Sequence, residues 1–352
     1  MAFDPHPLLD LDVTARAETF RFDLLDASLN RQGTLSVSKD TTPKIDHNSN
    51  RSIKRTMSGL KLSPRELLSI NPISDRVQPV MVLSDGSEWP LGVFVFGDFP
   101  RARYSHGVIP EGSFVDLGIS LDQPCPRNVG FIAGTHIGLA ILACLNELGL
   151  SSARVDPVDT VAGSSITYKA GETWLSILND LAGRAGLYSP AFDHSGRCLI
   201  LAPPPADDTA WADVTYDEGG RIFDGTILET DNTLDAPNRY VCIDTAATDA
   251  PIVGVFDVPA AAPHSIANRG YAVTTTIEVQ GIGSVAAAQA RARRAYLSAR
   301  SVETVSFATS ADPRHDVWNT VAYRGACYRE QSWSISCKAG APMTHEIRRF
   351  YS

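Results

Sequence analysis

The chain has 352 residues and a mass of 37.9 kDa, enough for two or three domains that each bury a core. With 43% hydrophobic and 20% charged residues, its composition excludes disordered and fibrous proteins, and a net charge of −9 argues against a protein that wraps nucleic acid. The longest apolar run, 137–150, contains Asn146 and Glu147 and is too short to cross a membrane, and the acidic start lacks the layout of a secretion signal.

The first third is predicted to be antiparallel β-structure. Apolar and polar residues alternate, as in strands with one buried face, at 19–24, 35–37, 53–57 and 115–119. Val80–Leu83 and Trp89–Phe96 flank Asp85–Gly86, which supplies the positive φ of a tight hairpin turn. We therefore expect a first β-barrel or tube domain over residues 1–125.

In the middle of the chain the apolar period changes from two to that of a helix. Thr135 is a predicted N-cap before an amphipathic helix that ends at Gly149. A second helix is predicted over 172–185, ended by Gly186, and the strand Cys198–Leu201 follows a turn. These elements predict a small α+β insert domain over residues 126–205.

The last third returns to strands, at 239–243, 252–258, 271–279 and 332–337. One helix interrupts them, capped by Ser284, with Arg291, Arg293, Arg294 and Arg300 toward its C-terminal end, where the helix dipole favours cations. We expect this arginine-rich half to be solvated, with a protein interface as the alternative. The prediction is a second β-barrel or tube domain over 206–352, so the fold class is α+β and mainly β.

Metal and imidazole chemistry finds little support in the sequence. None of the eight histidines has another at i+4, and His315–Asp316 is the only adjacent histidine–carboxylate pair. That pair could orient an imidazole for base catalysis, but a loop before the strand 317–323 is favoured. The six cysteines are widely spaced, without a C-x-x-C motif, which predicts buried thiols rather than a zinc site or disulfides.

Other catalytic patterns are also weak. Gly163–Ser164–Ser165 lacks the second glycine of a nucleophile elbow, and Gly281–Ile282–Gly283 is interpreted as a turn into a capped helix rather than a phosphate loop. An acidic cluster could supply the paired carboxylates of a glycoside hydrolase, although a solvated loop is favoured; its members are Asp207, Asp208, Asp213, Asp217 and Glu218. We predict no catalytic, cofactor-binding or metal-binding residue, no cofactor, and no enzymatic activity.

The order of several segments resembles that of phage tail hub proteins, a group that includes baseplate hubs, tail-tip hubs and the base of type VI secretion spikes. The helix Thr173–Leu187 leads into Phe192–Leu199, a pattern of helix, glycine and "fD-x-x-G" strand. Asn232 with Pro237–Val241 is similar to the family's strand entry, and Ala311–Val317 is similar to its "P-x-x-x-x-D-x-V" step. The resemblance extends over residues 165–350 and, less closely, over 15–120.

The resemblance implies a structural protein of a siphophage virion, assembled in the host cytoplasm. A trimer would place two related β-barrels per subunit around an axis and continue the tail tube. It would contact a hexameric distal tail ring, the tape-measure protein and the central fibre or spike, with DNA only as passing cargo and no membrane insertion. Because the chain stops at Ser352, receptor binding and wall hydrolysis would fall to other proteins.

Two physical arguments accompany this interpretation. Three copies of a chain of net charge −9 carry −27, which would repel DNA passing through a ring. Contacts between subunits would cover strand edges, such as that expected at Ser332–Cys337, so an isolated monomer should aggregate. The alternatives are a distal tail protein or another minor tail ring protein and, from a different class, a cell-wall hydrolase.

Overall fold

The computed structural model describes residues 18–38, 40–62, 70–97, 111–204, 209–216, 222–223, 225–231, 236–245, 251–279, 281–298, 303–349 and 351. Across these residues, no helix combines the length and apolar character needed to span a bilayer. Strands dominate, and most of them pair in antiparallel fashion, so the predicted α+β, mainly β class is confirmed.

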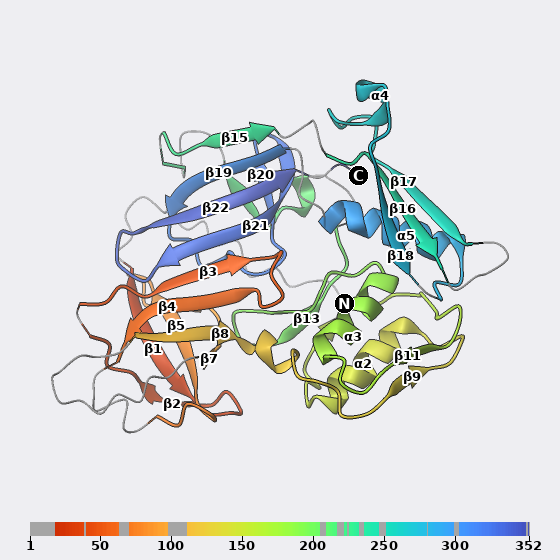
Figure 1. Ribbon diagram of the computed structural model, residues 1–352. Coiled ribbons are helices and arrows are strands. Elements are labelled where there is room, and N and C mark those ends of the chain that lie inside the picture. The colour runs from red at the N-terminus through yellow and green to blue at the C-terminus, as the bar shows by residue number, and fades with distance from the viewer. Residues whose placement is uncertain are drawn as a thin grey trace.

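The N-terminal strands form one half of a large sheet (Figure 1, orange). They are β1 (Thr19–Leu25), β2 (Arg31–Thr34), β3 (Lys44–Asn48), β4 (Arg55–Lys61), β5 (Arg76–Val82), β6 (Glu88–Pro90), β7 (Phe94–Phe96) and β8 (Glu111–Asp116). The predicted hairpin is present, with Gly86 at φ 84°. The predicted long strand Trp89–Phe96 is instead two short strands, because the chain turns at Gly92, whose φ is 127°.

The C-terminal strands form the other half of the same sheet, with β19, β21 and β22 blue and β15 green in Figure 1. They are β14 (Val214–Tyr216), β15 (Leu228–Asp231), β19 (Glu303–Ser310), β20 (Thr320–Tyr323), β21 (Ala326–Ser336) and β22 (Pro342–Arg349), with a 3-10 turn at Thr209–Trp211. Strand β21 pairs with β3, so the described strands of both halves make one 14-stranded sheet. Its main path is β15-β19-β22-β21-β3-β4-β8-β7-β5-β1-β2, with β20 branching from β21, β14 from β20 and β6 from β5.

The expectation that Ser332–Cys337 forms an exposed strand edge is wrong. These residues belong mainly to β21, which has β22 on one side and β3 on the other, in the interior of the sheet. The predicted alternation holds, since Trp333 and Ile335 are buried and the serines between them are partly exposed. The partner β3 lies almost 290 residues earlier in the chain, so local sequence did not reveal the pairing.

The hydrophobic core crosses the junction between the two halves. Phe22, Met81 and Phe94 from the N-terminal strands belong to the same buried cluster as Trp333 and Ile335 from β21. The two halves therefore share apolar contacts as well as backbone hydrogen bonds, and shared burial makes their relative placement rigid.

The middle of the chain packs around two helices beside the sheet (Figure 1, yellow-green). Its elements are a 3-10 turn (Leu117–Ser120), β9 (Val129–Phe131), α2 (Ile137–Glu147), β10 (Arg154–Val155), β11 (Ile166–Tyr168), α3 (Trp174–Arg184), β12 (Ala191–Phe192) and β13 (Cys198–Ile200). Both helices were predicted, and Gly149 and Gly186 end them with positive φ. The predicted strand 115–119 gives way to the 3-10 turn, and the N-cap of α2 is His136, not Thr135.

A further small sheet lies within the C-terminal region (Figure 1, teal). Its elements are β16 (Arg239–Asp244), β17 (Val253–Asp257), α4 (Ile266–Arg269), β18 (Thr274–Val279) and α5 (Val285–Ser298). Helix α5 packs on this sheet, and Ser284 accepts a hydrogen bond from the Ala287 amide, as the predicted cap requires. The short helix α4 was not predicted.

Candidate functional site: a buried polar network at the junction of the sheets

The segment 311–319, between β19 and β20, carries the buried polar residues Asp312, His315 and Asn319. Asp312 accepts hydrogen bonds from the backbone and side chain of Arg314, which closes the start of this loop. Asn319 accepts one from the Asp316 amide at 2.7 Å, which closes its end. The loop is therefore held in one conformation that points His315 and Asp316 in different directions.

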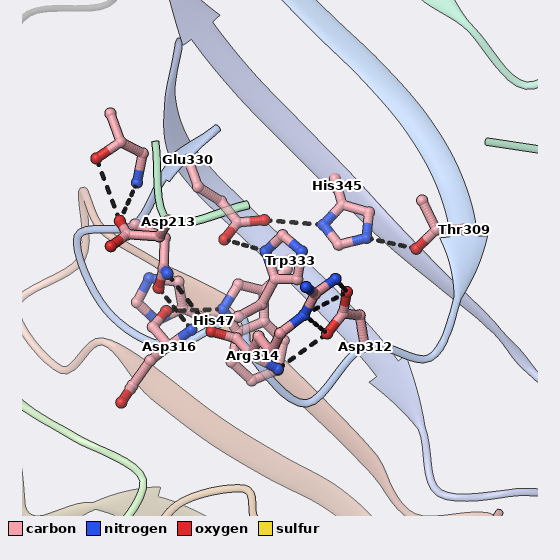
Figure 2. A network of polar contacts seen from close by, with 12 residues as sticks. His47, Asp213, Thr309, Asp312, Arg314, Asp316, Glu330, Trp333 and His345 are labelled. Carbon is pink, nitrogen blue, oxygen red and sulfur yellow. Dashed lines mark hydrogen bonds and ion pairs between the residues drawn. The ribbon is translucent and has the colours of Figure 1, made fainter. Parts of the chain in front are cut away.

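His315 lies in the C-terminal half, where Glu330 connects it to the imidazole of His345; Figure 2 shows the contact between Glu330 and His345. The two Glu330 carboxylate oxygens lie 2.7 Å from His315 Nδ1 and 2.8 Å from His345 Nδ1. The other ring nitrogens lie 2.6 Å from the Tyr216 hydroxyl and 2.9 Å from the Thr309 hydroxyl. The network thus connects β14, β19, β21, β22 and the loop.

Burial and charge set the protonation of this network. Burial alone raises the pKa of Glu330, but the two imidazoles outweigh it and lower that pKa to about 2. Burial lowers the pKa of His315, but the Glu330 charge outweighs it and the net shift is upward. Burial and repulsion from His315 lower the pKa of His345. The charged Glu330 carboxylate therefore favours the protonated form of His315, whereas burial and repulsion disfavour protonation of His345.

The same three side chains have the residue types of a metal site, with ligand atoms within 4.8 Å of one another. Two ligands each 2.0–2.2 Å from a tetrahedral ion would be about 3.3–3.6 Å apart. The nitrogen–oxygen distances of 2.7 and 2.8 Å are shorter and are those of charge-assisted hydrogen bonds. The geometry therefore describes a hydrogen-bonded network, and its centre is closed, since Glu330 is 1% exposed.

Asp316 points the other way and links all three parts of the chain. Its carboxylate forms an ion pair with Arg55 of β4 and accepts a hydrogen bond from the His194 amide in the turn before β13. Its carbonyl accepts a hydrogen bond from the indole of Trp333 at 3.0 Å. The Trp333 ring also stacks on His47 at 5.4 Å. This arrangement locks the N-terminal sheet, the middle region and the loop together.

The chemistry of these contacts is structural. Paired charges and satisfied hydrogen bonds inside a sheet junction fix orientation, whereas catalysis needs a reacting group that substrate can reach. The disfavoured alternative, a catalytic His315–Asp316 pair, is not seen: the His315 ring nitrogens contact Glu330 and Tyr216, and the Asp316 carboxylate pairs with Arg55. The predicted loop before β20 is present.

The structure describes one member of the acidic cluster and all six cysteines. Asp213 binds the amide and hydroxyl of Thr320 through its carboxylate, a strand-end contact. The other members of the acidic cluster, Asp207, Asp208, Asp217 and Glu218, lie outside the described residues. All six cysteines are free thiols, and five of them are buried.

The glycines of the motifs at 163–165 and 281–283 allow two backbone segments to approach closely. The amides of Gly281 and Ile282 donate to the Asp244 carboxylate at 2.9 and 2.8 Å, which is the predicted turn into a capped helix. A Cβ added to Gly163 would overlap the Cα of Gly283, so the two backbones touch. These contacts hold the middle region against the α5 unit, which consists of helix α5 and the small sheet of β16, β17 and β18.

The expectation of a solvated arginine cluster is wrong for two of its members. Arg291 and Arg294 turn toward α3, where a Cβ on Gly183 would overlap the Arg291 guanidinium. Both line a cavity together with Lys54 and Arg329. Because local sequence cannot show that α3 packs there, the pattern suggested exposure.

Glu330 and Arg329 were missed as site residues. The one available signal is that β21 carries consecutive charged residues, Arg329 and Glu330, in a run where residues on both faces are buried. A strand with polar residues buried on both faces requires polar partners from other elements. The partners of Glu330 are His315 and His345, and Arg329 donates to the Leu297 carbonyl, so all of them come from other elements.

Comparisons with known proteins rest on structure alone. No protein-family model matches the sequence, and a search of curated proteins found no match. Among solved structures, a tail protein from Neisseria meningitidis MC58 superposes with a TM-score of 0.61 at 13% identity, over 94% of this chain and 97% of that one.

Two prophage proteins are similar over comparable lengths. The 43 kDa tail protein of prophage MuSo2 from Shewanella oneidensis has a TM-score of 0.60 at 13% identity, covering 94% of this chain and 98% of its own. The prophage tail protein gp18 from Listeria monocytogenes EGD-e has a TM-score of 0.55 at 9% identity, covering 93% and 94%. The chain therefore shares the fold of these phage tail proteins over 93–94% of its length.

Proposed function

We propose that this chain is a structural protein of a phage tail and forms the hub at the tail tip or baseplate. The observation that carries the proposal is the match of almost the whole chain to three tail proteins, each also covered almost entirely. The match includes the joined sheet, the helical middle region and the α5 unit. A protein that has this whole arrangement, rather than one shared domain, is best explained by the same kind of task.

The joined sheet supports a ring built from three copies. Each chain brings two antiparallel β halves side by side, so a trimer would present six halves around an axis. That number would match a hexameric distal tail ring on one side, while the threefold axis would suit a central fibre or spike on the other. Three copies carry a net charge of −27, which favours passage of DNA rather than its retention.

In this position the hub would enclose the end of the tape-measure protein, reside in the virion and touch DNA only during ejection. The three parts of the chain, which we propose as two tube domains and an insert, would act as one rigid wall. The Asp316 contacts support that rigidity, because they connect the three parts, and the Glu330 network joins the strands within the C-terminal part.

Copy number per virion tests this placement. Quantitative mass spectrometry of purified particles against the major tail protein should give three copies. Six copies would contradict the hub and support the alternative, a distal tail or other minor ring protein.

The hydrolase alternative is tested separately. Incubation of the purified chain with peptidoglycan should release no soluble fragments. Release of fragments by the wild-type chain but not by Asp217→Ala or Glu218→Ala variants would establish an enzyme and overturn the purely structural role.

A further inference from the structure

A cavity of about 420 Å³ lies where the three parts of the chain meet. Its walls come from the turn before β4, from α3, from α5 and β18, and from Trp318 with β21. Pockets of this size hold small molecules in many proteins. It is distinct from the Glu330 network.

The cavity is lined by positive charge. Five cationic side chains face it: Arg51, Lys54, Arg291, Arg294 and Arg329. Among the described residues, no carboxylate lines it. The two acids near enough to affect these charges are engaged elsewhere, since Asp116 binds the amides of Arg55 and Gly118, and Asp180 binds Tyr168 and Arg184.

Two of these cationic groups keep a buried guanidinium nitrogen without a hydrogen-bond partner among the described residues, whereas the Lys54 ammonium donates to the Ser49 and Arg51 carbonyls and to the Ser189 hydroxyl. Arg329 is 97% buried, and its Nε has no acceptor among the described residues; nor does Nη1 of Arg294. Arg348 lies directly opposite Arg329 on β22, is also buried, and leaves Nε and Nη1 unsatisfied within the same described part of the chain. Like charges paired across strands are destabilising, and unpaired buried charges are costly.

Burial and repulsion among the cationic side chains lower the pKa values of two of them. Burial, together with Arg329 and Arg294, lowers the pKa of Lys54 to about 8. Burial, together with Arg291 and Arg329, lowers the pKa of Arg294 to about 9. Both side chains nevertheless stay largely protonated at neutral pH, so the cavity keeps its charge.

The backbone at the cavity wall is strained. Trp318 has a φ of 61°, a left-handed conformation that is rare for a bulky residue. Its ring stacks on Tyr188 at 4.5 Å, with the Arg329 guanidinium 5.0 Å and the Lys54 ammonium 5.0 Å from the ring centroid. Strained backbone of this kind concentrates at functional sites, and here the strained residue presents its ring to two cations.

We propose that this cavity binds a phosphate group, either as inorganic phosphate or as the end of a small phosphate monoester, as a counter-ion between the three parts of the chain. Guanidinium groups offer paired donors that match a tetrahedral oxyanion, and a doubly charged anion can satisfy several cations at once. The cavity has more room than a bare ion needs, so the test includes an ester.

Isothermal titration calorimetry on the full chain, in chloride buffer of constant ionic strength, tests the proposal with inorganic phosphate and with glycerol 2-phosphate. We expect saturable binding of at least one of them and a matching rise in the unfolding temperature. Binding of inorganic phosphate alone identifies a free ion, whereas tighter binding of the ester identifies an ester ligand.

Arg294→Gln removes one cavity charge and should weaken binding about tenfold or more, the loss expected for a charged hydrogen bond. Without phosphate this variant should be at least as stable as wild type, because repulsion is relieved. Arg293→Gln, next to it in α5 and outside the cavity lining, is the matched control and should bind like wild type.

If Arg294→Gln does not fold, Arg51→Gln carries the test, because that side chain is exposed at the cavity. The proposal is overturned if neither probe binds the wild-type chain. It is also overturned if phosphate stabilises wild type, the cavity variant and the control equally, which would show a general salt effect. Neither result bears on the tail position of the protein.

Discussion

Glu330 is the single side chain on which most of the buried network depends. It accepts hydrogen bonds from two imidazoles, and its pKa of about 2 keeps it charged under all ordinary conditions. We expect Glu330→Gln to lower the free energy of unfolding by about 3–5 kcal/mol, because the His315 imidazolium loses its buried partner. Urea titration followed by tryptophan fluorescence measures the change.

Glu346 provides the control for this substitution. It lies on the neighbouring strand β22, is exposed, and pairs in register with Ser332 of β21. Glu346→Gln should change the free energy of unfolding by less than about 0.5 kcal/mol. Equal effects of the two variants would contradict a special role for the network.

The buried histidines predict how stability depends on pH. Burial lowers the pKa of His47 to about 3 and that of His194 to about 4, and His345 is lowered as well. Below pH 6.5 the unfolded chain takes up protons at these sites while the folded chain does not. Stability should therefore fall between pH 6.5 and 4, by about 1.4 kcal/mol per pH unit for each histidine.

His315 has the opposite effect on the pH dependence of stability. Its raised pKa contributes stability that is complete below 6.5 and is lost as the pH rises through the folded value. The Glu330 contribution is lost only as the pH falls from 4.5 toward 2. Urea unfolding from pH 4 to 8 should show a maximum near pH 6.5, and His194→Gln should flatten the acid side. A constant free energy from pH 4.5 to 6.5 would refute this account.

At the level of elements, the contact between Gly163 and Gly283 fixes the middle region against the α5 unit. An added Cβ would overlap backbone, which cannot move aside as a flexible side chain could. Gly163→Ala should therefore destabilise the chain by about 1–3 kcal/mol, the usual cost of overpacking. Thermal unfolding monitored by circular dichroism measures the change.

Gly138 in α2 is the matched control, since an added Cβ there meets only a side-chain carbon of Val158 at 3.4 Å. Gly138→Ala should be neutral or stabilising by up to about 1 kcal/mol, because alanine favours the helix. If Gly163→Ala were equally harmless, the two units would not be held by this contact.

The sequence predicted those elements whose signal is local. Helix α3 and the turn at Gly86 followed from apolar spacing and glycine position, and both are present. The pairing of β21 with β3 and the packing of α5 against α3 depend on residues far apart in the chain. For that reason the expectations of an exposed edge strand and of solvated arginines were wrong. The Glu330 network was missed for the same reason, since its imidazoles come from a loop and another strand.

On the scale of the whole molecule, the sheet ends at β15 and β2, neither of which pairs on its outer side with another strand in the described part of the chain. In β15, Leu228 is 63% exposed. Edges of this kind attract further strands, and we expect them to meet between neighbouring subunits. Leu228→Lys should shift the chain toward smaller assemblies in size-exclusion chromatography with light scattering, while remaining folded.

Ile132→Lys is the control, because Ile132 is 76% exposed in the middle region, away from both ends of the sheet. This variant should assemble like wild type. Equal loss of assembly in both variants would mean that the β15 edge has no particular part in the interface.

The measurement closest to the central claim is the mass of the purified wild-type chain by sedimentation velocity at micromolar concentration. Our account predicts a discrete species of three times 37.9 kDa, or its self-association into larger rings. A stable, monodisperse monomer at that concentration would contradict the proposal that this fold closes a ring with its own copies.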